Sequence, residues 1–364
     1  MSTRESQVTY HCLRLLALVT VIAIVGLKAD IALGQAQSPS EHGQESTWSA
    51  PRLPDGRPDL QGFWTTQTFT PLQRPEHLAN QEFYSEEEWV SLQTQLTAEG
   101  VDPLAGSVIN IEDAAAREER LYQTNRDASY VHYDNEIWLR TPVPKGLSSR
   151  RTSLITDPPN GRIPQQTAGS ARRAAARREG RQQRGAFDGY ETRPLSERCI
   201  VWPHSGPPML PPAYNDIHQI LQTPDYVVLF TELNNSLPRI IPLDARPPLT
   251  DKIQLIPGNS RGRWEGDTLV VESRNFTDKT RFQGSTDALR VVERFTRIAD
   301  ETIRYEFTVE DPSTWAQPWS VEIPMLKTEG PMYEYACHEG NYDVGHILEI
   351  NRNLERQQAA ENTK

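Results

Sequence analysis

The chain has 364 residues, a formal net charge of −11 and 28 prolines. This length allows one elaborated domain or two. The acidic balance argues against nucleic-acid binding and against docking on anionic lipid, and the prolines indicate long irregular connections rather than many helices.

The first residues have the pattern of an export signal. Arg4 and Arg14 precede an apolar run at residues 15–27, which is as long as a signal-peptide core and too short to span a membrane comfortably. Small residues at 32–34 and 34–36 offer two cleavage sites. We therefore predict a signal peptide over residues 1–36 and a periplasmic or secreted mature protein with no transmembrane span. An uncleaved N-terminal anchor is the alternative.

The mature chain keeps two cysteines, Cys199 and Cys337, because Cys12 leaves with the signal peptide. A pair of cysteines in an oxidising compartment favours a disulfide as much as two buried thiols. We take a disulfide between Cys199 and Cys337 as the prediction. No Cys-x-x-Cys motif for redox or zinc chemistry is present.

Residues 37–198 predict an irregular, partly helical N-terminal arm. After a lead rich in serine, proline and glycine, Phe63 and Trp64 are expected to anchor ordered structure. Ser85 is a typical N-cap, and acidic residues follow it in the first turn. The remaining elements expected here are helices over 86–99 and 111–123 and strands over 130–140 and 151–156.

An arginine- and alanine-rich stretch at 171–184 stands out in this acidic chain. A basic site for an anionic ligand is one interpretation. Because no aromatic residues alternate with the arginines, as stacking on bases would require, we favour a solvated helix that pairs with acidic patches of its own chain.

From residue 199 onward the pattern changes to short strands. Ile303, Tyr305, Phe307 and Val309 alternate with polar residues, and this period of two places one face on a core and the other in water. Because polar turns join short strands, we predict an antiparallel meander that closes into a lipocalin-like barrel or packs as a sandwich. The domain is expected over 199–348, with a frayed polar tail over 349–364. The strands are expected at residues 217–222, 226–232, 239–243, 268–273, 289–298, 303–309, 321–325 and 331–337.

Several stretches resemble a large family of secreted bacterial proteins of uncharacterised function. The most specific are Arg-Trp-Glu-Gly-Asp-Thr-Leu-Val-Val-Glu at 263–272 and Tyr-Glu-Tyr-Ala-Cys-His-Glu-Gly-Asn-Tyr at 333–342. The likeness extends over almost the whole mature chain, including the Pro-Pro-Asn-Gly turn at 158–161. It implies an exported β-rich protein and points to no catalytic residue.

The best candidate for chemistry is His338, which follows the last expected strand in a loop that can face a barrel mouth. A histidine there can act as a general acid or base. Its neighbour Glu339 would point elsewhere in a strand, so we expect the partner carboxylate to be Glu293 or Glu232. Glu293 shares a face with the apolar Val291 and Phe295, so if that face is inward, its carboxylate lies in an apolar setting. The alternative is that His338 caps the loop and Glu293 faces solvent.

Two further groups complete the predicted site. Tyr335 or Asn341 would donate a hydrogen bond to developing negative charge. The residues predicted to line a ligand pocket are Trp202, Trp264, Tyr333, Tyr342 and His218. Aromatic residues of this kind also serve simply as core.

We predict no cofactor. If a metal is bound, its ligands would come from His204, His218, His338 and His346, but no pair of these has diagnostic spacing. Separate hydrogen bonding of each histidine is the simpler interpretation.

The leading hypothesis is an exported barrel enzyme that acts on a small organic molecule by cofactor-free acid/base chemistry, as a lyase, isomerase or hydrolase. The alternatives are a non-catalytic lipocalin-like binding protein, a metal-dependent enzyme, and a structural protein of the envelope that uses the arm as its contact surface. Convergence of titratable groups inside the barrel would favour the enzyme.

Overall fold

The computed structural model describes residues 48–98, 101, 116, 145–183, 185–202, 205–212, 216–232, 238–244 and 246–362. The expected signal peptide and the strand at 130–140 lie outside these residues, as does the helix at 111–123 apart from Ala116. All described residues belong to one compact unit, residues 45–364.

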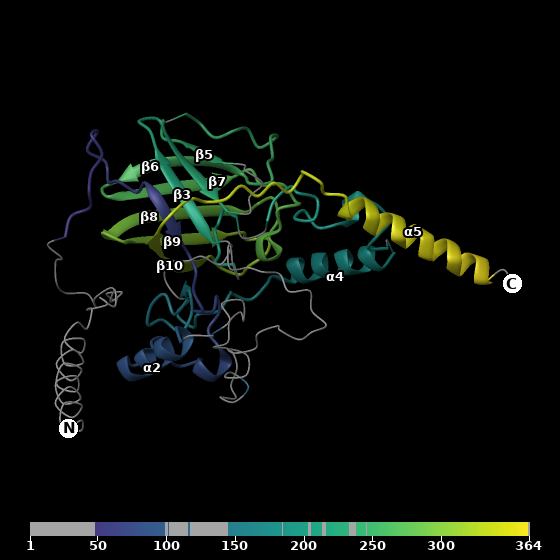
Figure 1. The fold of residues 1–364 in the computed structure, drawn as a ribbon, viewed down its shortest axis with the longest axis horizontal. Coiled ribbons are helices and arrows are strands. Elements are labelled where there is room, and N and C mark those ends of the chain that lie inside the picture. The colour runs from purple at the N-terminus through teal and green to yellow at the C-terminus, as the bar shows by residue number, and fades with distance from the viewer. Residues whose placement is uncertain are drawn as a thin grey trace, which may run out of the picture. The chain divides into compact units, whose positions relative to one another are not determined.

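Ten strands form a single antiparallel sheet that curves into a nearly closed barrel, as expected from the sequence (Figure 1). The order is β5-β4-β3-β1-β10-β9-β8-β7-β6, and β2 pairs with β10 beside this series. Their bounds are β1 Gly62–Thr65, β2 Ile155–Asp157, β3 Ile217–Gln222, β4 Tyr226–Thr231, β5 Arg239–Pro242, β6 Asn259–Glu265, β7 Thr268–Arg274, β8 Arg290–Ala299, β9 Thr302–Glu310 and β10 Trp319–Thr328.

The alternation in the sequence sets which residues fill the barrel. On β9, Ile303, Tyr305, Phe307 and Val309 are all buried, and the residues between them are partly exposed. Facing residues on β8 and β10 follow the same phase, because paired strands in register share one inward face.

The N-terminal arm is part of the barrel, so the boundary expected at residue 199 is wrong. Strand β1 lies between β3 and β10, and Trp64 pairs with His218 on one side and Lys327 on the other. The Trp64 side chain is fully buried. The arm therefore supplies a central strand, which no local pattern in its four residues revealed.

Two predicted strands differ from the structure. Residues 331–337 form no strand and have no ladder partner among the described residues. Strand β6, Asn259–Glu265, was not predicted, because two arginines and one glutamate interrupt its alternation. The expected strand at 151–156 is reduced to the three residues of β2.

The described helices are α2 Glu86–Leu96, α4 Ala168–Gln183 and α5 Asp343–Asn362, together with three short 3-10 turns, Glu76–Leu78, Tyr190–Thr192 and Phe282–Gly284. Ser85 is the N-cap of helix α2, as the sequence predicted, and it forms a capping box with Glu88. In place of a frayed tail, residues 349–362 continue α5 (Figure 1). No helix in the described part of the chain is long and apolar enough to cross a membrane.

Helix α4 contains the arginine-rich stretch. Arg173 donates to the carbonyl oxygen of Ser313 at 2.8 Å, which attaches the helix to the loop before β10. Pairing of its other arginines with acidic patches stays a prediction.

Candidate functional site at the plugged mouth of the barrel

A polar network crosses the interior of the barrel. Arg239 on β5 pairs with Glu293 on β8 through both carboxylate oxygens, with Nη1 to Oε1 at 3.0 Å. The Tyr305 hydroxyl donates to Glu293 Oε1 at 2.8 Å. Ser260 and Ser273 accept hydrogen bonds from the same guanidinium. Glu293 thus faces inward, but in polar surroundings rather than the apolar ones that its neighbours in sequence suggested.

The Tyr305 hydroxyl is neutral under all ordinary conditions. Burial foremost, and then the charge of Glu293, raise the pKa of Tyr305 well above its usual value. The phenol therefore keeps its proton and can donate it in a hydrogen bond.

The network also closes the barrel. Strands β5 and β6 end the series and lie beside each other without a ladder, and Arg239 bridges them by donating to Ser260 at 3.0 Å. Gly262 permits this approach, because a Cβ there would lie 2.8 Å from Ile241 Cγ2 and Leu243 Cδ2. Side-chain bonds here take the place of the missing backbone ladder.

Residues 205–212, which we call the plug, reach this network through Met209. Met209 is buried, and its backbone N–H donates to the Tyr305 oxygen at 2.9 Å. On its other side, the sulfur of Met209 lies 3.9 Å from the hydroxyl oxygen of Thr231. The plug is therefore held by interior polar groups on two sides.

The polar chain continues beyond Met209 to a buried histidine. His218 Nδ1 lies 3.1 Å from Thr231 Oγ1, and its Nε2 lies 3.2 Å from Thr66 Oγ1. His218 is 1% exposed. His218, Glu293 and Tyr305 are thus buried inside the barrel and connected through Thr231 and Met209.

The outer face of the plug forms one wall of a cavity of about 320 Å³. Most of its surface is apolar, and Phe282 at its base stacks on the core residue Trp319 with ring centroids 5.9 Å apart. A cavity with apolar walls and few polar groups is the usual form of a small-molecule site. Its lining residues are Val201, Trp202, Gly206, Pro207, Leu210, Pro211, Pro212, Ile256, Thr280, Arg281, Phe282 and Gln283.

The polar groups of this cavity come from one strained turn. Arg281 and Gln283 have positive φ angles, 46° and 49°, a left-handed conformation that costs free energy for residues other than glycine. The hydroxyl of Thr280 anchors the turn to the carbonyl oxygen of Ile256 at 2.7 Å. Arg281 Nε donates to Asp278 O at 2.9 Å, and its Nη atoms have no partner within the described part of the chain. This turn places the guanidinium group of Arg281 beside the apolar walls of the cavity.

The structure does not bring the predicted catalytic residues together. His338 is exposed in a turn outside the barrel, whereas Glu293 is sealed inside it. Glu232 is buried and its carboxylate faces the backbone N–H of Ile217 at 3.4 Å. The predicted pairing of His338 with a strand carboxylate depended on a strand at 331–337 that does not form.

The segment around His338 is instead fixed by a disulfide between Cys199 and Cys337, as predicted, with Cα atoms 5.6 Å apart. Asn341 donates to the carbonyl oxygen of Glu197 at 3.2 Å, and Tyr335 packs edge-on against Trp202 with ring centroids 6.2 Å apart. Both residues predicted as hydrogen-bond donors thus serve to hold this segment beside the cavity.

Of the predicted ligand-binding residues, Trp202 lines the cavity. Trp264 packs against the hydrophobic core, and His218 lies inside the barrel. Tyr333 and Tyr342 are exposed, and Tyr342 stacks on His346 with ring centroids 6.3 Å apart.

Among the described residues, His218, His338 and His346 do not form a metal centre. His204 lies outside them, and no group of three or more His, Cys, Asp or Glu side chains in the described ranges is arranged to hold an ion. The remaining three histidines lie in separate surroundings, inside the barrel, in the 338 turn and on α5.

Sequence reasoning missed Arg239, Met209 and the turn at 280–283. A signal for Arg239 was present, because it alternates in phase with the apolar Ile241 on its strand, as Glu293 does on β8. An inward arginine and an inward glutamate in one barrel predict a buried ion pair. No comparable signal marks Met209 or the strained turn.

Another buried carboxyl, that of Asp216, gives the fold a pH dependence. Burial raises the pKa of Asp216 to about 6 from the ordinary 3.8, while the hydrogen bond from Thr65 and the charge of Lys145 act in the opposite direction. Because the pKa is higher in the folded than in the unfolded chain, the stabilising contribution is complete below about pH 3.8 and is lost as pH rises through about 6.

Asp216→Asn should therefore stabilise the protein more at neutral than at acidic pH. The gain over wild type in urea unfolding is expected to be larger by about 2 kcal/mol at about pH 7.5 than at about pH 4.5. Asp267→Asn, at an exposed carboxylate paired with Arg52, is the control and should show no such difference. Equal behaviour of the two variants would contradict a buried, proton-binding Asp216.

Comparison with known proteins does not assign this chain to a family. Neither a family model, nor a curated protein, nor a solved structure matches this chain. The fold and the site therefore define only a class, an antiparallel β-barrel with a plugged mouth and a cavity on the outer face of the plug.

Proposed function

We propose that this is an exported binding protein that holds a small organic molecule, with an apolar body and an anionic group, on the plug of its barrel. The observation that carries the proposal is the cavity of about 320 Å³ beside Arg281. Its walls suit an apolar body, and the Nη groups of Arg281 suit a carboxylate or sulfonate.

Three features support binding at this position. The wall at Trp202 is held in place by Tyr335 and by the nearby disulfide of Cys199, so the cavity is preformed. Preformed walls reduce the entropy lost when a ligand binds. The disulfide also suits an oxidising compartment and so supports export.

Two fluorescent dyes of nearly equal shape test this proposal. Anilinonaphthalene sulfonate carries an anionic group, and phenylnaphthylamine is neutral. Arg281→Gln is expected to weaken binding of the sulfonate roughly fivefold and to leave the neutral dye unchanged, because one partly exposed ion pair is lost. Trp202→Leu should weaken both dyes, because it removes an apolar wall.

Arg263→Gln is the matched control, since Arg263 is exposed on β6, pairs with Glu265 and lines neither cavity. Dye fluorescence that is the same in wild type, Arg281→Gln and Trp202→Leu would refute binding on the plug. Near-ultraviolet circular dichroism of each variant establishes that the fold is retained.

A second candidate function, acid/base catalysis, is supported by the convergence of Tyr305, Glu293 and His218 beneath Met209. A substrate would reach these groups only if Met209 moved aside. Proton exchange between a bound organic acid and deuterated water, followed by NMR and lost in Tyr305→Phe, would favour this function over passive binding.

A further inference from the structure

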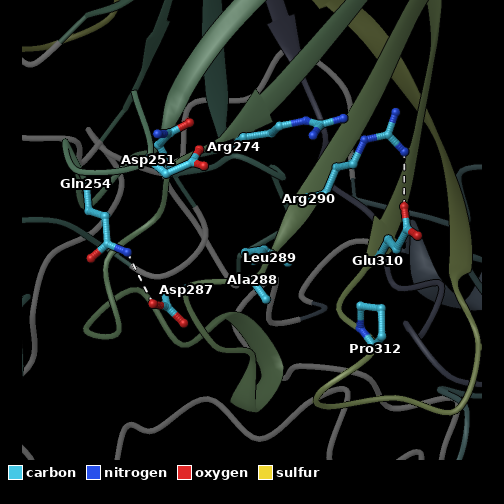
Figure 2. Close-up of a pocket in the computed structure, with 10 residues that line it drawn as sticks. Asp251, Gln254, Arg274, Asp287, Ala288, Leu289, Arg290, Glu310 and Pro312 are labelled. Atoms are coloured by element: carbon cyan, nitrogen blue, oxygen red, sulfur yellow. Dashed lines mark hydrogen bonds and ion pairs between the residues drawn. The ribbon is translucent and has the colours of Figure 1, made fainter. Parts of the chain in front are cut away.

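A second cavity, of about 630 Å³, lies between the loop before β6 and the edge formed by β7, β8 and the end of β9 (Figure 2). None of its lining residues belongs to the cavity on the plug. Its lining is polar and contains both signs of charge, and Leu289 with Ala288 forms an apolar floor.

One wall carries a fixed pair of guanidinium groups. Arg274 and Arg290 both donate through Nε to the same oxygen of Glu272, Arg290 at 3.0 Å. Arg290 Nη1 also donates to Glu310 Oε2 at 3.0 Å. Both Nη groups of Arg274 and Nη2 of Arg290 have no partner among the described residues. These contacts orient two cations and leave donors for a ligand.

Carboxylates lie on the other side of the cavity. Figure 2 shows Asp251 and Asp287 on the left and the guanidinium groups of Arg274 and Arg290 on the right. Gln254 donates to Asp287 Oδ2 at 3.1 Å and fixes that carboxylate. No polar contact of the Asp251 side chain is found within the described part of the chain.

The loop that carries Asp251 is held in place independently of any ligand. Asn275, in a left-handed conformation with φ of 59°, lines the cavity and directs its amide at this loop. The amide nitrogen donates to three carbonyl oxygens, those of Leu249, Thr250 and Ile253. Both charged walls are therefore built before a ligand arrives.

We propose that this cavity binds a zwitterion, a short peptide with free termini, with its carboxylate on Arg274 and Arg290 and its ammonium on Asp251 and Asp287. A ligand with only negative charge would meet the carboxylates, and one with only positive charge would meet the guanidinium groups. Separated charges of both signs complement the two walls, and the volume exceeds the need of a single amino acid.

Three probes test the assignment by isothermal titration calorimetry: trialanine, N-acetyl trialanine and trialanine amide. Trialanine is expected to bind tightest, and blocking either terminus should weaken binding roughly fivefold. Asp251→Asn should weaken trialanine but not the acetylated peptide, which lacks the ammonium. Arg274→Gln should weaken trialanine but not the amide, which lacks the carboxylate.

Arg263→Gln again serves as the control and should bind all three peptides as wild type does. Equal binding of the three peptides to wild type, or no binding of any, overturns the proposal. So does a loss in Asp251→Asn that is the same for every peptide. Because these residues do not line the plug cavity, failure here leaves the dye experiment unaffected, and the reverse also holds.

Discussion

Glu293→Gln is expected to lower the free energy of unfolding by about 3–5 kcal/mol, because it leaves the buried guanidinium of Arg239 without its counter-charge. The ion pair is almost fully buried, with side-chain exposures of 10% for Arg239 and 0% for Glu293. The loss should appear in urea unfolding at neutral pH, together with easier opening of the barrel between β5 and β6.

Glu265→Gln is the matched control. It makes the same chemical change at an exposed carboxylate on the same barrel, one that pairs with Arg263 and Arg294. Such pairs contribute about 0–1 kcal/mol.

A double replacement tests whether the buried cost arises from the unpaired charge. Arg239→Met with Glu293→Leu removes both charges together. The double variant should therefore lose less free energy of unfolding than the single variants Arg239→Met and Glu293→Leu lose in sum. Strict additivity would show that Arg239 and Glu293 are not coupled.

Removal of the disulfide is the second large effect. Replacing Cys199 and Cys337 by serine is expected to cost about 2–5 kcal/mol, because the bridge restricts the unfolded chain over a separation of 138 residues. The same replacement should weaken dye binding on the plug, since Tyr335 is held against Trp202 by the segment that the bridge fixes.

Reduction of the wild-type protein provides the control. In the presence of dithiothreitol its melting temperature should fall to that of the double serine variant, which itself should not respond to the reagent. A wild-type melting temperature that does not change after full reduction would show that the bridge adds nothing to stability.

The two cavities differ in the source of their residues. The plug cavity is formed by the plug and its preceding residues together with Ile256 and the turn at 280–283, whereas the zwitterion cavity is formed by strand ends and the loops before β6 and β8. The loop over 249–258 and the loop over 275–289 each contribute to both. Thr277 N–H donates to Leu255 O at 3.1 Å and links these two loops. The two cavities therefore share two loops that this hydrogen bond joins.

The sequence carried most of the information on the strands after residue 217. Alternation on β8 and β9 predicted their lengths within a residue or two. This was possible because adjacent residues alone show the alternation of apolar and polar side chains. The two cysteines that follow residue 36 made a bridge one of two equal possibilities, and the structure contains that bridge. Its apolar neighbours Val291 and Phe295 left Glu293 either inward or facing solvent, and the structure buries all three residues.

The candidate site was not predictable in the same way. His338 drew attention by its chemistry, yet the structure leaves it exposed, because residues 331–337 have no ladder partner. The position of the plug depends on the hydrogen bond between Met209 and Tyr305, which lie 96 residues apart in the chain. A single sequence does not state which distant residues meet.

The sequence by itself determined the antiparallel β-character of this protein, because apolar periodicity is a local property of the chain, whereas the cysteine count left a disulfide and two free thiols equally open. Only the tertiary structure decided that β1 enters the barrel between β3 and β10, that Arg239 and Glu293 close it, and that Met209 plugs it. Those features depend on long-range pairing, in which burial of each polar group requires a partner supplied by a distant strand or loop.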